Sequence, residues 1–361
     1  KIVIDTNISG LFKDDHPLAV AVNVVDNNMA GSQDMEVMID TKTVDGMLDV
    51  DLLTAVDALQ TSLEARYPNT IGRTYSLANI VKDTNQVMND DNPEFYRIPK
   101  SNQTVSQLLY LFNSANPEDR RNLVSDDYSR SHIAVTSRSM GSFGYQQMFA
   151  EVELDIEARF AHLKTAYPDL EIVLTGTMAT FMVVSDEIAR SQFNGFALAL
   201  VLISLIMIIT LGSLRGGVMG MIPNAIPAFL AFGLMGLLGI PLDTDTLLIA
   251  PIILGIAVDD TIHFIGRYRR EATAGRSTYT AIELATSHEG RASLTTAIIN
   301  SLSFSIMMFS SYKPTAWFGG LLALTMAVAF ITEVFIIPAV ITVLPRIYAT
   351  AQVARRMGVT P

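Results

Sequence analysis

Five long apolar runs in the second half of the chain limit the folds that are open to it. They cover residues 195–212, 218–238, 246–266, 294–310 and 318–344. Each run is close to the ~20 residues that a helix needs to cross a bilayer at about 1.5 Å per residue. None contains a lysine or an arginine. We therefore expect five membrane-spanning helices.

Charge divides the chain near residue 185. Residues 1–185 hold 26 acidic and 14 basic side chains, and residues 186–361 hold 10 and 11. This asymmetry predicts an acidic soluble domain over residues 1–185, a five-helix transmembrane domain over 186–345 and a cytoplasmic tail over 346–361. The acidic balance argues against a nucleic-acid partner, and the lack of cysteine excludes disulfides and thiolate metal sites. No signal peptide precedes the soluble domain, so we expect a fragment of a longer protein.

The soluble domain shows a repeated order of helical and extended segments. From hydrophobic periodicity and proline breaks we predict a strand at 19–25, a helix at 49–66, an extended segment at 71–76, a helix at 77–88, a strand at 133–136, a helix at 148–167, an extended segment at 172–174 and a helix from about 178. Leu63, Tyr67 and Pro68 match Leu163, Tyr167 and Pro168 at an offset of 100 residues. This repeat predicts an internal duplication of a strand–helix–strand unit, with two α+β lobes and a cleft between them. Each Tyr-Pro pair is interpreted as a helix stop without chemistry.

Arginines gather in alternate loops between the apolar runs. They are Arg215 after the first run, Arg267, Arg269, Arg270, Arg276 and Arg291 after the third, and Arg346, Arg355 and Arg356 after the fifth. The positive-inside rule places these loops in the cytoplasm. We therefore expect the acidic domain outside the cytoplasm and the C-terminus inside it.

Two adjacent acids, Asp259 and Asp260, lie past the middle of the third run. One charge at the centre of a spanning helix costs about 3 kcal/mol on insertion scales. Two neighbouring carboxylates without a cation cannot both stay ionised there, so at least one should hold a proton. The pair predicts a site that takes up and releases protons. The alternative is that both acids face a water-filled vestibule or bond neighbouring helices for assembly.

Four more polar residues in the spans are candidates for the same proton relay. His263 lies one helical turn beyond the acids and could pass protons to water. Thr296 and Asn300 share one face of the fourth run and are predicted to hydrogen-bond the carboxylates. Glu333 lies midway along the fifth run. Solvent contact for His263, and helix packing for the other three, are the alternatives. No catalytic, cofactor or metal pattern accompanies them.

Three motifs carry a family resemblance. They are Met221–Pro227 running on to Gly239–Asp243, then Gly255–Phe264 followed by Arg267–Glu271, and last Phe318–Leu322 through Glu333 to Pro338 and Ala339. They are similar to the ninth, tenth and twelfth spans of resistance-nodulation-division (RND) exporters, in particular the MMPL-like branch that handles hydrophobic and amphiphilic molecules. In this resemblance, Asp259 and Asp260 take the positions of the proton-carrying acids. Many drug-efflux relatives have a lysine in the tenth span, so their substrates are not carried over.

The resemblance implies twelve spans in two similar halves, each with a large extracytoplasmic porter domain. The chain would then be a porter domain with duplicated ferredoxin-like lobes, followed by spans eight to twelve of a bacterial inner-membrane protein. The implied partners are protons, a lipid or amphiphile substrate and the missing N-terminal half, with a homo-oligomer or a periplasmic lipid carrier as further candidates. The porter domain would lie in the periplasm.

We therefore expect export of lipids or other amphiphiles, driven by the proton-motive force, and no enzymatic activity. One alternative is a lipid or sterol sensor, or a secretion accessory, of the same fold. An intramembrane aspartyl protease would need a Gly-x-Gly-Asp motif, whereas Val258 precedes Asp259 here. Sodium coupling is also left open, because carboxylates and hydroxyls can bind that ion.

Overall fold

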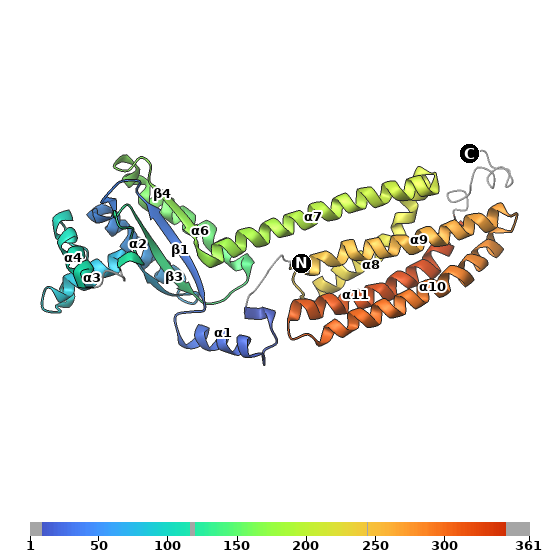
Figure 1. Ribbon diagram of the computed structural model, residues 1–361, viewed down its shortest axis with the longest axis horizontal. Helices are drawn as coiled ribbons and strands as arrows, with labels where there is room; N and C mark the ends of the chain where they lie inside the picture. The colour runs from blue at the N-terminus through green and yellow to red at the C-terminus, as the bar shows by residue number, and fades with distance from the viewer. Residues whose placement is uncertain (1–8, 116–119, 244, 344–361) are drawn as a thin grey trace. The chain divides into compact units, whose positions relative to one another are not determined.

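The computed structural model describes residues 9–115, 120–243 and 245–343 (Figure 1). They form two compact units that divide between Ser185 and Asp186, with Leu11–Lys13 belonging to the second unit. The predicted tail at 346–361 lies outside the described residues.

The first unit is built on a four-stranded antiparallel sheet. Its strands are β1 (Gln33–Asp40), β2 (Ile71–Tyr75), β3 (Arg130–Ser137) and β4 (Glu171–Thr175), in the spatial order β2-β3-β1-β4. β3 runs antiparallel to β1 and β2, and β1 runs antiparallel to β4. Two helices connect these strands in the β-α-β-β-α-β pattern of ferredoxin-like folds.

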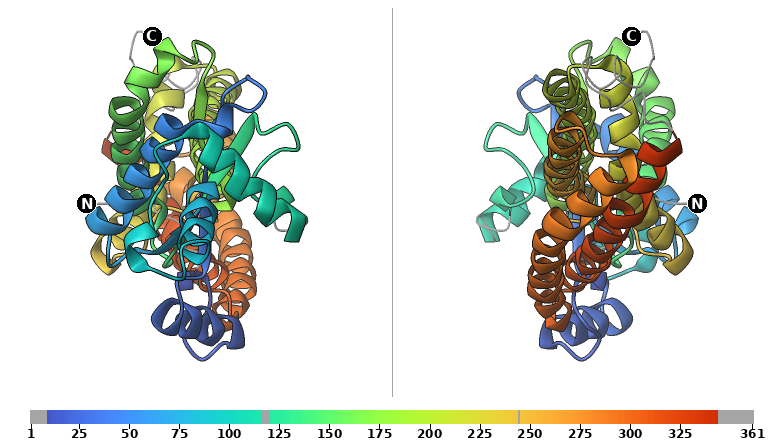
Figure 2. Two further views of the ribbon diagram at one scale, coloured as in Figure 1. Left: turned by 90° about the vertical axis from the view of Figure 1, so that its left-hand side faces the viewer. Right: turned by 90° about the vertical axis from the view of Figure 1, so that its right-hand side faces the viewer.

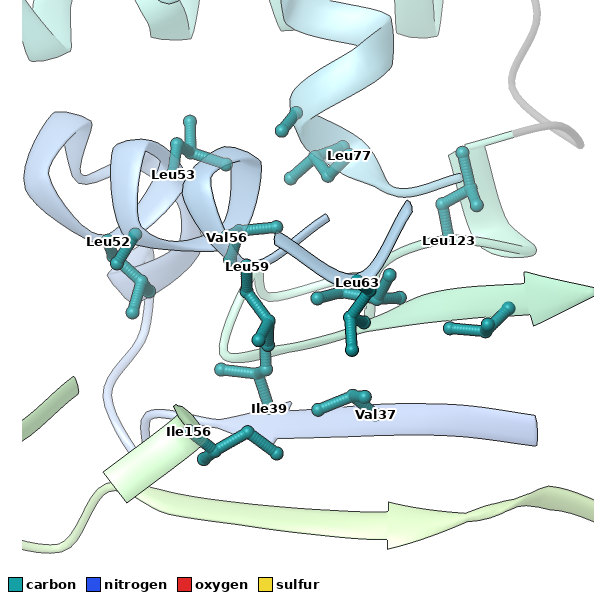
Figure 3. Close-up of a cluster of buried hydrophobic side chains, with 14 of the residues drawn as sticks. Val37, Ile39, Leu52, Leu53, Val56, Leu59, Leu63, Leu77, Leu123 and Ile156 are labelled. Carbon is teal, nitrogen blue, oxygen red and sulfur yellow. The ribbon is translucent and has the colours of Figure 1, made fainter. Parts of the chain in front are cut away.

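The helices of this unit are α1 (Pro17–Asn28), α2 (Val50–Arg66), α3 (Leu77–Val87), α4 (Asn102–Ala115) and α6 (Ser142–Phe160), with short 3-10 turns η1 (Ser9–Leu11), η2 (Gly46–Leu48), η3 (Pro93–Phe95) and η4 (Ala161–Thr165). Four of them, α2, α3, α4 and α6, supply buried side chains to the core that includes the sheet. Asp49 begins α2 by accepting hydrogen bonds from the backbone of Asp51 and Leu52. Val56, Leu59 and Leu63 of α2 lie on the side of the helix that faces Val37 and Ile39 of β1, whereas Leu53 points away from this strand (Figure 3).

The order of elements repeats along the first unit, but the two strand–helix–strand units do not form two lobes. β2 and β4 begin at positions 71 and 171, at the same offset as the two Tyr-Pro pairs. However, β3 lies between β1 and β2, and β1 lies between β3 and β4. In the described residues the two strand–helix–strand units interlock in one sheet, so the prediction of paired lobes with a cleft is wrong. Each unit alone would leave backbone groups unpaired between its two strands, and the inserted strand satisfies them.

The predicted strand at 19–25 is also wrong, because these residues lie in α1. His16 accepts a hydrogen bond from the backbone N–H of Leu18, and Pro17 fixes the first helical position. The first strand is instead β1, whose buried Met35, Val37 and Ile39 alternate with more exposed neighbours. β1 also contains aspartates, which are uncommon in strands, so its sequence does not clearly indicate a strand.

Two tyrosines link α2 to the segment that contains α6. Tyr67, at the end of α2, donates a hydrogen bond to Glu151 on α6. Tyr167, which follows α6 and η4, donates to Asp49 Oδ2 at the start of α2, at 3.0 Å. Burial, and then the hydrogen bond to the carboxylate, raise the pKa of each tyrosine to about 12. The tyrosines of both Tyr-Pro pairs therefore link α2 to the α6 segment. Only the first pair ends its helix, because α6 already ends at Phe160.

The second unit is helical. It contains the larger part of α7 (Gly176–Leu211), followed by α8 (Leu214–Leu238), η5 (Thr246–Leu248), α9 (Ile249–Thr273), α10 (Thr278–Ile306), η6 (Met307–Phe309), α11 (Lys313–Ile331), a π-helical turn η7 (Thr332–Ile336) and α12 (Ile337–Val343). Five helical segments in the described part are long and apolar enough to cross a membrane. This confirms the expected helical bundle.

α9 is the central helix of the bundle. In its most apolar 18-residue stretch, 50% of the residues are buried, against 6% in the corresponding stretch of α10. It packs against α8, α10 and α11, while α10 also packs along α11 (Figure 2). Two apolar clusters, one around Phe264 and Tyr268 and the other around Ile253 and Leu322, hold these helices together. A polar residue of α9 therefore lies in the interior of the bundle if it faces one of these helices, and on the outer face if it does not.

Candidate functional site

A polar cluster joins three helical elements inside the bundle. Asp260 comes from α9, Ser293 from α10 and Glu333 from η7. Ser293 Oγ lies 3.1 Å from Asp260 Oδ2 and also hydrogen-bonds Glu333 Oε2. Ser293 and Glu333 are buried and Asp260 is half-buried. We call these three residues the carboxyl cluster.

A break in helix geometry positions Glu333. The chain forms a π-helical turn at Thr332–Ile336, directly before Pro338 in α12. Proline lacks the N–H that would bond the carbonyl four residues earlier, and its ring clashes with that carbonyl. A wider turn relieves this conflict, and single π turns of this kind are common at functional sites.

The hydrogen bonds of the cluster require one more proton than the serine supplies. The Ser293 hydroxyl contacts two carboxyl groups but has a single proton to donate. Glu333 Oε1 is buried and has no hydrogen-bond partner among the described residues. No ion pair in the described part of the bundle includes Asp260 or Glu333. If one carboxyl is protonated, it can donate to Ser293 while Ser293 donates to the other.

A second polar contact fixes α9 beside the cluster. Thr261 Oγ1 lies 2.8 Å from Asn224 Oδ1 on α8, and both side chains are buried. Asn224 Nδ2 also donates to the carbonyl of Gly220. Asn224 belongs to the first of the three sequence motifs, which gave it no role. Its role in the structure is to hold α8 against the residue that follows Asp260.

The acid doublet is split between the interior and the surface of the bundle. The Asp259 side chain is 74% exposed, and its Oδ1 lies 3.5 Å from Nε2 of His263, which is 66% exposed. Adjacent residues on a helix point about 100° apart, so Asp259 cannot share the environment of Asp260. His263 does lie with Asp259, one turn away, but it is not in the carboxyl cluster.

The predicted partners on α10 do not reach the carboxyl groups. Thr296 is exposed and donates to the carbonyl of Ala292 on its own helix, at 3.1 Å. Asn300 is half-buried, and its side chain makes no hydrogen bond to another described residue. The residue of α10 that hydrogen-bonds the carboxyl groups is Ser293. It lies three residues before Thr296 and one residue before the apolar run that begins at residue 294.

Among the residues that the structure describes, no three His, Cys, Asp or Glu side chains lie close enough together to hold a metal ion. Two carboxyls and a hydroxyl can form hydrogen bonds with one another and exchange a proton.

Comparison with known proteins places the chain in a family. The MMPL family model matches residues 10–359. A membrane protein of Methanocaldococcus jannaschii is 25% identical over 346 residues, which cover 94% of this chain and 84% of that relative. With its apolar helices, this makes the chain a multi-pass membrane protein. The match extends over both units, and the chain therefore belongs to the MMPL family.

Proposed function

We propose that the protein is an RND-type transporter that uses protons to export lipids or other amphiphilic molecules. The observation that carries this proposal is the carboxyl cluster, in which two acids share one hydroxyl inside a membrane-spanning bundle. An ionised carboxylate without a countercharge costs several kcal/mol in such surroundings. A proton is the smallest ligand that removes this cost.

Proton exchange would change the packing of the three helices that meet at the cluster. With one carboxyl protonated, Ser293 links Asp260 to Glu333 and holds α9, α10 and η7 together. Loss of the proton leaves two negative groups facing one hydroxyl, and their repulsion favours separation of α9 from η7. The π turn at Glu333 offers a place for this movement, because closing it to an α turn would rotate Glu333 about the helix axis.

The movement would reach the first unit through α7, which is continuous from Gly176 to Leu211. We propose that the segment from Met178 to Phe193 transmits it. In this account the first unit lies in the periplasm of a bacterial inner-membrane protein and handles the substrate there.

Charge movement after a pH jump tests the proposal without knowledge of the substrate. Purified protein is reconstituted in liposomes on a solid-supported membrane, and the transient current is recorded. We expect a current for the wild type and its loss in Asp260→Asn and Glu333→Gln. Glu283→Gln is the matched control, because Glu283 is an exposed acid on α10.

The same liposomes, loaded with a fluorescently labelled fatty acid, separate a transporter from a sensor. Transport predicts that a pH gradient drives lipid movement in the wild type and in Glu283→Gln. A charge movement without lipid flux, over a panel of labelled lipids, would favour a sensor. Equal currents in the wild type and in the Asp260→Asn/Glu333→Gln double variant would contradict proton coupling altogether.

A further inference from the structure

The inner side of α10 carries an acid outside the carboxyl cluster. Ala281, Ala285, Glu289 and Ser293 follow one another at intervals of four residues, which places them along one side of the helix. The two alanines and Ser293 are buried, and Glu289 is half-buried. The other acidic and basic side chains of α10 are exposed, and they are Glu283, His288 and Arg291. Glu289 is therefore turned further towards the interior than these three.

The exposed surface of α10 changes from polar to apolar about one turn after Glu289. The exposed side chains around Glu289 are polar, and they include His288 and Arg291. From residue 294 onwards the large exposed side chains are apolar, and they include Leu294 and Ile298. Because polar surface favours water and apolar surface favours lipid, the boundary between the two falls close to Ser293. Glu289 lies about 6 Å before Ser293 along the helix, on the water side of this boundary.

An apolar layer closes the interior of the bundle between the carboxyl cluster and the loop that joins α9 to α10. It contains Phe264 of α9, Ala285 of α10 and Ile341 of α12, which are buried in one cluster. Close packing of this kind leaves few voids that could hold water. A proton that moves between the carboxyl cluster and this end of the bundle therefore needs a polar group beside the layer. Glu289 lies one helical turn from Ala285 and one from Ser293, so it is placed for this role.

Glu289 is close to the carboxyl cluster but is not fixed by a partner of its own. Its neighbour Gly290 is buried, and a Cβ added there would lie 3.8 Å from Cγ2 of Val334, the residue after Glu333. Asp260 and Glu289 are the two carboxylates whose charges act on Glu333. Among the described residues, Glu289 forms no ion pair and no side-chain hydrogen bond. A buried acid with a purely structural role would have such a partner.

We infer that Glu289 carries protons between water and the carboxyl cluster. The inference rests on the proposed proton coupling of Asp260 and Glu333. For release, a carboxyl of the cluster gives its proton to the ionised Glu289 through hydrogen-bonded water, and Glu289 then gives a proton to bulk water. Only O–H bonds break and form, and Glu289 is ionised again after each transfer. The reverse steps load the cluster.

The rate of the pH-jump current separates a proton carrier from the cluster that it serves. In Glu289→Gln the current should decay about ten- to a hundredfold more slowly than in the wild type, because proton transfer by a placed acid is lost. The total charge moved should stay within about twofold of the wild type, since Asp260 and Glu333 still take up the proton. Glu289→Asp should keep the rate within about threefold. Glu283→Gln, on the exposed side of the same helix, is the matched control and should change neither quantity.

Chemical restoration of the carboxylate tests the role of Glu289 within one variant. The chain has no cysteine of its own, so Glu289→Cys introduces a single thiol. This variant should be as slow as Glu289→Gln. Reaction with 2-carboxyethyl methanethiosulfonate places a carboxylate at the same position and should restore at least half of the lost rate on a logarithmic scale. Methyl methanethiosulfonate, which adds a neutral group to the same folded protein, is the control and should leave the variant slow.

Three results would overturn the inference. They are a wild-type rate in Glu289→Gln, equal rates after the charged and the neutral reagent, and a loss of total charge in Glu289→Gln that matches its loss of rate, which would indicate a structural role. In each of these cases the wild type still gives a current that Asp260→Asn and Glu333→Gln abolish, so the proposed function stands. A wild type without any current would instead contradict the proposed function, and this inference with it.

Discussion

The behaviour of the carboxyl cluster depends on a single hydroxyl. Ser293 is buried between two acids that come from different helices, and no other described side chain bridges them. A hydrogen bond to a charged group contributes about 1.5–3 kcal/mol to stability. Without this bond, a buried acid has no partner to offset the free energy that it lost on leaving water. Ser293 should therefore matter more than its neighbours on α10 that face outwards.

Removal of this hydroxyl should reduce proton-driven charge movement strongly. For Ser293→Ala we expect a loss of ten- to a hundredfold, which corresponds to about 1.5–3 kcal/mol. Ser303→Ala, at an exposed position of α10, is the matched control and should keep the wild-type current. A Ser293→Ala protein with the wild-type current would show that the serine does not link the two acids in function.

At the scale of elements, the prediction from sequence succeeded where periodicity is strong. The apolar spacing and Pro68 gave α2 nearly to the residue, and the five spans followed from length and hydropathy. The prediction failed where one or two residues decide whether a segment forms a helix or a strand. Pro17 and the cap from His16 make α1 a helix despite its alternating pattern. The interlocked sheet depends on which strands pair, which is a long-range property that no local pattern records.

The tyrosine cross-links predict a specific loss of stability at alkaline pH. The pKa of Tyr67 and Tyr167 is about 12 in the folded protein and 10.0 in its ordinary state. Below pH 10 the stabilisation is complete. As the pH rises from 10 to 12, the unfolded chain loses phenol protons that the folded protein keeps, so the free energy of unfolding falls.

The Tyr67→Phe/Tyr167→Phe double variant isolates this effect. It should be less stable than the wild type below pH 10, by about 1 kcal/mol per hydrogen bond, and should show a flatter decline above it. The free energy of unfolding below pH 10, and its decline above pH 10, are both measured by urea unfolding. The fluorescence of a label on Val87→Cys, an exposed position, reports the unfolding. Parallel declines in the two proteins between pH 10 and 12 would contradict this account.

At the scale of the whole molecule, the candidate site was predicted in part. Asp260 and Glu333 are predictable because intramembrane acids are rare, and the structure brings them together. The sequence could not show that Asp259 turns outwards, since the direction of each residue depends on the packing of α9 against three neighbours. Ser293 was missed because serine is common in membrane helices and carries little signal alone.

The distribution of arginine predicts how the molecule sits in its membrane. A membrane-impermeant maleimide should label Val44→Cys in the first unit without permeabilisation, and Ala274→Cys between α9 and α10 only after it. Both positions are exposed. Ser311→Cys, in the exposed loop between η6 and α11, should behave like Val44→Cys. The reverse pattern would place the first unit in the cytoplasm and exclude it from a periplasmic role.

Infrared spectroscopy of the protonated carboxyl band tests the central claim most directly. The account predicts that the protein in lipid at neutral pH holds one protonated carboxyl in the Asp260–Ser293–Glu333 cluster. Its band should disappear in the Asp260→Asn/Glu333→Gln variant, persist in Glu283→Gln and be lost as the pH is raised. A spectrum in which the wild type and the double variant show the same carboxyl band at every pH would contradict the claim that these two acids share an exchangeable proton.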